Sequence, residues 1–120
     1  YHAAGGTGIG VLRAAADAGK LGIGVDSNQN GLHPGKVLTS MLKRVDTATH
    51  KTFMDAKDGK WQPGVVNLGL AEEGVAWALD DNNRSLITPE MKEAVDKAAE
   101  EIKSGTIKVH DYRSDNKCPV

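Results

Sequence analysis

The sequence predicts an α/β fold with a largely parallel sheet. Segments with helical spacing alternate with short apolar segments typical of strands, which is the pattern of α/β domains. The chain of 120 residues fits a single domain. Its 39% hydrophobic and 26% charged residues indicate a folded globular chain rather than a disordered one.

A helix and a strand are expected near the start of the chain. Ile9, Leu12 and Ala16 have the spacing of one helix face, and Gly19 is a suitable residue to end that helix. Residues 21–26, LGIGVD, read as a short buried strand.

The middle of the chain is expected to form a loop, a short strand and a long helix. Residues 27–35, SNQNGLHPG, have the composition of a loop, and residues 36–40, KVLTS, are expected to be a strand or the end of one. An amphipathic helix is expected from Ser40 to Gly59. The stripe along this helix consists of Met41, Val45, Ala48, Thr52 and Ala56.

The last part of the chain is expected to contribute strands and one further helix. Residues 64–70 and 74–79 read as strands beside the turn AEEG, and residues 106–112 read as a final strand. The helix has a clear start signal, because Thr88 suits the cap position and Pro89 suits the first turn. Its buried stripe would consist of Met91, Val95, Ala98 and Ile102.

The glycine-rich segment AAGGTGIG does not match a phosphate-binding motif. After Gly6 and Gly8, a dinucleotide fingerprint needs a third glycine where Val11 stands. When the pattern starts from Gly8 and Gly10, the third position is Arg13. The segment GLHPGKV likewise lacks the spacing of a phosphate-binding loop.

A ligand-binding role for this region remains open on chemical grounds. Glycines let a backbone approach a ligand closely, and the N-terminus of a helix offers free N–H groups. Asp26 closes the next expected strand, and its carboxylate can accept hydrogen bonds from both hydroxyls of a cis-diol. The alternative is a tight turn followed by an ordinary aspartate at the end of a strand.

Several segments together resemble a known family. HAAGGTGIGVLRAA, IGVDSNQ and PGKVLTSMLKRVD are similar to the C-terminal part of the basic membrane protein (BMP) family. The similarity continues through GVVNLGLAEEGVAWAL and LITPEMKEAVDKAAEEIKSG. Family members are substrate-binding lipoproteins of ABC transporters, including purine nucleoside receptors. The resemblance therefore implies a Rossmann-like three-layer α/β/α lobe of a type I periplasmic binding protein, incomplete at its N-terminus.

The resemblance also implies which residues bind the ligand. Asp26 would hold ribose hydroxyls, and Gly5 and Gly6 would line the cleft through backbone groups. Lys43, expected one turn into the helix that starts at Ser40, would reach the polar edge of the ligand. From the residues alone, Lys43 reads as a solvated charge on a polar helix face. The aromatic residues that stack on the base are expected outside this chain.

The function implied by the resemblance is capture of a nucleoside, with a purine expected, for import. The implied partner of the full-length protein is an ABC transporter permease, and the implied location is extracytoplasmic with a lipid anchor. No signal sequence is expected within these 120 residues. The expected domain comprises residues 1–112. Residues 113–120 are expected to form a loose tail, in which Cys118 is a passive thiol.

Because the lobe is expected to be incomplete, missing strands would expose apolar edges. We therefore expect the isolated chain to associate with itself or to rearrange.

Two other functions stay open, namely a dinucleotide-binding enzyme domain and a sugar or autoinducer receptor of the same fold. The absent third glycine counts against the first, and no nucleophile–base pair indicates an enzyme. A net charge of −1 and 4% aromatic residues argue against a nucleic-acid partner. No cofactor is expected. No metal is expected either, because the histidines lack the spacing of a ligand set: His2, His33, His50 and His110.

Overall fold

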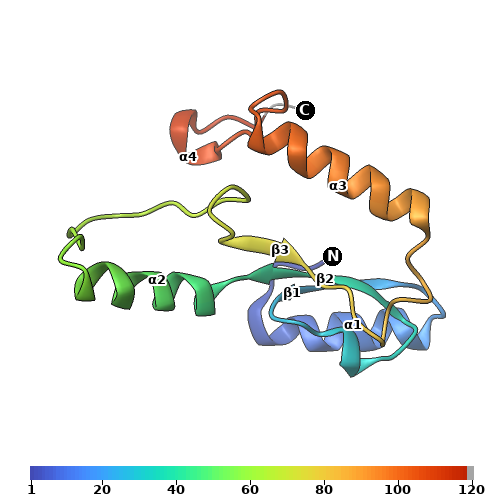
Figure 1. Ribbon diagram of the computed structural model, residues 1–120. Coiled ribbons are helices and arrows are strands. Elements are labelled where there is room, and N and C mark those ends of the chain that lie inside the picture. The colour runs from blue at the N-terminus through green and yellow to red at the C-terminus, as the bar shows by residue number, and fades with distance from the viewer. Residues whose placement is uncertain (119–120) are drawn as a thin grey trace. The chain divides into compact units, whose positions relative to one another are not determined.

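The structure is a computed structural model that describes residues 1–118. Its contacts divide the chain into two compact units, Tyr1–Thr88 and a second unit that begins at Pro89. The first unit contains a three-stranded sheet together with helices (Figure 1). This arrangement confirms the α/β class.

The sheet has the strand order β1-β2-β3, formed by Gly22–Asp26, Val37–Lys43 and Val75–Trp77. Strands β1 and β2 are parallel, as the sequence predicts, and a loop with one short 3-10 turn (η2, Asn30–Leu32) joins them. Strand β3 pairs with β2 in the antiparallel direction. The sheet is therefore mixed, with its parallel pair at the start of the chain.

Helix α1 spans Gly8–Asp17 and packs against β1 (Figure 1). Leu12 carries this contact and is only 2% exposed. A methyl group at Gly22 would lie 2.6 Å from Cδ2 of Leu12, so the glycine in β1 lets helix and strand approach closely. Gly19 has a φ of 69°, which is the left-handed conformation that ends many helices. The predictions for this helix and for β1 are confirmed.

The predicted start of the second helix at Ser40 is wrong. Strand β2 continues to Lys43, and helix α2 spans Val45–Lys57. The reason is tertiary pairing, because Met41, Leu42 and Lys43 lie opposite three residues of β3 in the ladder. No residue of α2 is buried, so its expected stripe covers no core in the described structure, although a left-handed Gly59 follows the helix as expected.

Residues 64–70, which the sequence predicts as a strand, are not one. Gly64 has a φ of 147°, a conformation that side chains rarely adopt. The backbone N–H of Gly69 donates to a carboxylate oxygen of Glu72, and the N–H of Gly74 donates to the carbonyl of Gly69. These local hydrogen bonds close a turn instead of a ladder. The following segment forms strand β3 over residues 75–77, and the N–H of Ala78 also donates to the carbonyl of Ser40.

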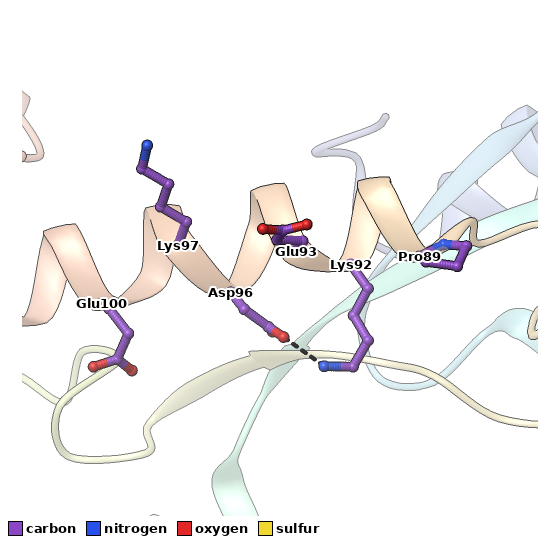
Figure 2. A pocket seen from close by; sticks show the side chains of 6 residues that line it. All are labelled: Pro89, Lys92, Glu93, Asp96, Lys97 and Glu100. Carbon is purple, nitrogen blue, oxygen red and sulfur yellow. Dashed lines mark hydrogen bonds and ion pairs between the residues drawn. The ribbon is translucent and has the colours of Figure 1, made fainter.

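The second unit is dominated by helix α3, which spans Pro89–Lys103 as the sequence predicts. Figure 2 shows one face of it, where Lys92 pairs with Asp96 across one turn and further charged side chains alternate in sign. Its expected stripe is not buried, since Met91 is 47% and Val95 43% exposed. In the described residues of this unit, α3 is followed by irregular chain and one short helix, and no strand is present to cover the stripe.

The chain does not form the predicted strand at residues 106–112. Tyr112–Asp115 form a short helix, α4, instead. The side chain of Asp111 caps it by accepting a hydrogen bond from the backbone N–H of Arg113 at 3.0 Å. Helix α4 includes residue 113, where the loose tail was expected to begin. Cys118 is exposed. In the described part of the chain, no helix combines the length and apolar character that a bilayer span needs.

The interior of the first unit contains several hydrogen-bonded polar side chains, whereas Nδ1 of the buried His2 has no hydrogen-bond partner among the described residues. Asn83 Nδ2 donates to the carbonyls of Leu38 and Ala78, both at 2.9 Å. Ser40 Oγ donates to Asn30 Oδ1 at 2.8 Å. Buried amides and hydroxyls are tolerated when they find partners in this way. Among the described residues, the buried hydrophobic side chains are Leu12, Val37 and Ala78.

Candidate functional site

A hollow of about 280 Å³ lies where β1 ends and α1 begins. We call it the Asp26 hollow. It brings together Gly5, Gly6 and Asp26, three of the four residues expected in the site. The full lining consists of His2, Gly5, Gly6, Ile9, Val25, Asp26, Ser27 and Gln29.

The glycine-rich segment forms a 3-10 turn, η1, over Gly5–Thr7, and α1 follows directly. Gly5 has a φ of 53°, so a side chain here would strain the backbone. Gly8 has a different role, because a methyl group at this position would overlap the imidazole ring of His2. The glycines therefore make a turn beside the hollow and leave room for a buried histidine.

Asp26 is the last residue of β1 and adopts a φ of 69°. A non-glycine residue in this left-handed region is uncommon, although aspartate tolerates it better than most. Its side chain is 54% exposed at the hollow. Strained residues of this kind cluster at functional sites.

Lys43 contacts Asp26, with its Nζ 2.9 Å from Oδ1. The lysine is the last residue of β2 and not a residue one turn into a helix, which corrects the expected position. The ladder explains the contact, because Asp26 lies opposite Leu42, the neighbour of Lys43. With side chains 60% and 54% exposed, this ion pair contributes about 0–1 kcal/mol to stability.

Two further residues of the hollow, His2 and Gln29, were not identified from the sequence. His2 is 7% exposed, and its Nε2 lies 3.4 Å from Oε1 of Gln29. The same oxygen accepts a hydrogen bond from the backbone N–H of Val25 at 2.9 Å. The one available signal was the position of Gln29, three residues after the aspartate in the segment VDSNQ.

The loop that follows Asp26 is anchored to the turn after β3. Asp80 Oδ2 accepts hydrogen bonds from Asn28 Nδ2 at 2.7 Å and from Asn30 Nδ2 at 3.1 Å. Its other oxygen accepts from the backbone N–H of Asn82 at 2.7 Å. The Asn28 bond, followed by the Asn82 bond, lowers the pKa of the Asp80 carboxyl below its ordinary value of 3.8.

Two other hollows among the described residues offer less chemistry than the Asp26 hollow. A hollow of about 520 Å³ lies between α2 and the segment after it, lined in part by Trp61, which is 51% exposed. A shallow hollow follows the charged face of α3 (Figure 2). Within residues 1–118, no three histidine, cysteine, aspartate or glutamate side chains gather as a metal site would require. The Asp26 hollow is therefore the candidate site.

Residues 1–113 match the profile of the family described as ABC transporter substrate-binding protein PnrA-like, Bmp. The chain belongs to the Bmp family. Basic membrane protein D of Borreliella burgdorferi is 34% identical over 113 residues, which cover 91% of this chain and 33% of that protein. An uncharacterized lipoprotein of Pyrococcus abyssi is 38% identical over 87 residues, or 67% of this chain and 22% of that protein.

Solved structures show the same fold. An ABC transporter solute-binding protein from Aeropyrum pernix K1 matches with a TM-score of 0.64 and 25% identity, over 84% of this chain and 36% of that one. A protein described as a transcriptional activator of the comK gene from Bacillus halodurans matches with a TM-score of 0.76 and 22% identity, over 88% and 36%. The chain thus spans about a third or less of the proteins that it matches here.

The Bmp family is a family of ABC transporter substrate-binding proteins, so the resemblance seen in the sequence is confirmed. The likeness to the Aeropyrum protein is consistent with a Rossmann-like lobe.

Proposed function

We propose that this chain supplies one wall of the solute site of an ABC import system, and that the solute is a nucleoside, with a purine base expected, or a related compound that carries ribose. The observation that carries the proposal is that the four expected site residues lie close together. Gly5, Gly6 and Asp26 line a single hollow, and Lys43 bonds to the carboxylate of Asp26. Membership of a substrate-binding family supports a binding role without chemistry.

The paired charges favour a neutral ligand with hydroxyl groups. An ionised carboxylate only accepts hydrogen bonds, so Asp26 suits hydroxyl donors such as those of a ribose diol. Lys43 uses one of its donors on Oδ1, which leaves Oδ2 for the ligand and further lysine donors for a ligand oxygen. Together the two groups carry no net charge, so the wall does not attract a phosphate as a free cation would.

The hollow is too small to enclose such a solute alone. Its volume of about 280 Å³ lies just below the range of about 300–1,000 Å³ that is usual for ligand pockets. Because the chain spans about a third of the relatives, we propose that the contacts to the base come from protein outside this chain. The isolated chain is therefore expected to bind a nucleoside weakly or not at all.

The partner and the location follow from the same proposal. A permease of an ABC transporter would receive the solute from the full-length protein. Relatives named as lipoproteins support an extracytoplasmic location with a lipid anchor.

The test is to identify the solute that the full-length protein carries. Native mass spectrometry of protein purified without refolding should show a bound nucleoside, and calorimetry should then measure inosine, ribose and NAD separately. Binding of inosine without binding of NAD supports the proposal. Binding of ribose alone would indicate a sugar receptor, binding of NAD would indicate a dinucleotide site, and binding of none of the three would overturn the proposal.

A further inference from the structure

We propose that Gln29 is a positioning residue for Asp26, because its amide oxygen fixes the backbone that holds the carboxylate at the hollow. The inference rests on the proposed function, since the position of Asp26 affects binding only if the hollow is part of the solute site. Gln29 also lines the hollow, but the role proposed here is exerted through Asp26.

The hydrogen bonds of Gln29 join two segments that line the hollow to the neighbouring strand β2. Its Oε1 accepts from the backbone N–H of Val25 at 2.9 Å and lies 3.4 Å from Nε2 of His2. Its own backbone N–H donates to Ser40 Oγ at 2.9 Å. One residue therefore links the end of β1, the segment that leads into the glycine turn, and β2.

Asp26 needs such support because of its backbone conformation. Its φ of 69° is costly for a residue with a Cβ, and such conformations persist where the surroundings determine them strongly. Val25 immediately precedes Asp26, and the N–H of Ser27 donates to the carbonyl of Val25 at 2.9 Å. The hydrogen bond that Gln29 accepts from Val25 therefore fixes the first residue of this tight turn.

Gln29 is itself held in a single position. Ser40 is fully buried, and its hydroxyl also donates to Asn30 Oδ1, so the acceptor of the Gln29 N–H is fixed. Gly24 leaves the space that the side chain needs, because a methyl group there would lie 2.8 Å from Cβ of Gln29. Because both the backbone and the side chain of Gln29 are hydrogen-bonded, the residue can hold the end of β1 in a fixed geometry.

The test compares inosine with 2′,3′-dideoxyinosine, which lacks the diol, in the full-length protein. Gln29→Ala removes the acceptor and should reduce the preference for inosine about tenfold, the scale of one lost hydrogen bond. Gln29→Glu keeps an acceptor oxygen and should restore most of the preference. Gln62→Ala, the same change at a glutamine that lines the separate hollow beside α2, should leave the preference unchanged.

If Gln29→Ala loses the same affinity for both nucleosides, the effect is general destabilisation and the proposal is overturned. The proposal is also overturned if the affinity for neither nucleoside falls. Amide hydrogen exchange of Val25 gives a readout without ligand, and it should become about tenfold faster in Gln29→Ala. If the wild-type protein binds neither nucleoside, the proposed function fails. If the amide exchange of Val25 is unchanged in Gln29→Ala, the positioning role is refuted independently of ligand binding. If Gln29→Ala does not fold, Gln29→Met keeps the length of the side chain without its acceptor and takes its place.

Discussion

Replacing Asp26 by glycine and by alanine separates the carboxylate of this residue from its backbone conformation. Both substitutions remove the carboxylate and the ion pair with Lys43. They differ in the cost of the backbone, because Asp26 has a φ of 69° and only glycine adopts that region without a penalty.

The magnitude follows from two opposing terms. A left-handed conformation costs a residue with a Cβ about 1–2 kcal/mol. At ordinary positions glycine is less stabilising than alanine by about 0.5–1 kcal/mol, because it loses more conformational freedom on folding. The ion pair is lost equally from both variants. From the midpoints of these two ranges, we expect Asp26→Gly to be more stable than Asp26→Ala by about 0.7 kcal/mol.

Urea unfolding of the two variants measures this difference, and inosine calorimetry on the full-length protein measures the loss of the carboxylate. Both variants should lose inosine binding, because the ribose hydroxyls would face no acceptor. Ala14→Gly is the matched control, since Ala14 is an exposed residue within α1, where glycine should destabilise. If Asp26→Ala proves as stable as Asp26→Gly, the backbone argument is refuted. Unchanged inosine affinity would remove Asp26 from the site.

Three further results are expected. Gly8→Ala should destabilise the chain by about 1–3 kcal/mol in thermal unfolding, because the methyl group would displace the buried ring of His2. Because the pKa of Asp80 is lowered in the folded chain, its ionised carboxylate stabilises the fold at pH values above the ordinary pKa of 3.8. This stabilisation is lost as the pH falls through the lowered pKa. In Asp80→Asn, the free energy of unfolding should therefore fall less as the pH is lowered than it does in the wild-type chain. Finally, the isolated chain should self-associate in analytical ultracentrifugation, because it exposes side chains such as Val65, which is 92% accessible.

Contrary outcomes are equally specific. A fully stable Gly8→Ala variant would show that the His2 ring is not tightly held. An acid unfolding profile unchanged by Asp80→Asn would show that its hydrogen bonds contribute nothing to the fold. A compact monomer at high concentration would contradict the self-association.

The first part of the fold could be predicted because its signals are local. The spacing of Ile9 and Leu12, the glycine that ends α1 and the short apolar run before Asp26 all act within a few residues of each other. The family resemblance then pointed to Gly5, Gly6 and Asp26, which line one hollow.

The remaining features depend on contacts between distant segments. Residues 41–43 resemble the start of an amphipathic helix, but pairing with residues 75–77 keeps them in the sheet. That same pairing puts Lys43 beside Asp26, which a helix assignment could not reveal. The role of Gln29 depends on His2 and Val25, and no periodic pattern encodes a hydrogen bond of this kind.

The polar interior of the first unit has a consequence for its behaviour with temperature. Exposing apolar surface raises the heat capacity on unfolding, and exposing polar surface lowers it. Because Asn30, Ser40 and Asn83 are buried beside few apolar side chains, the heat-capacity change should fall below the usual value of about 12–15 cal/mol/K per residue. The free energy of unfolding should then vary little between cold and warm conditions, which keeps the geometry of the Asp26 hollow steady across them.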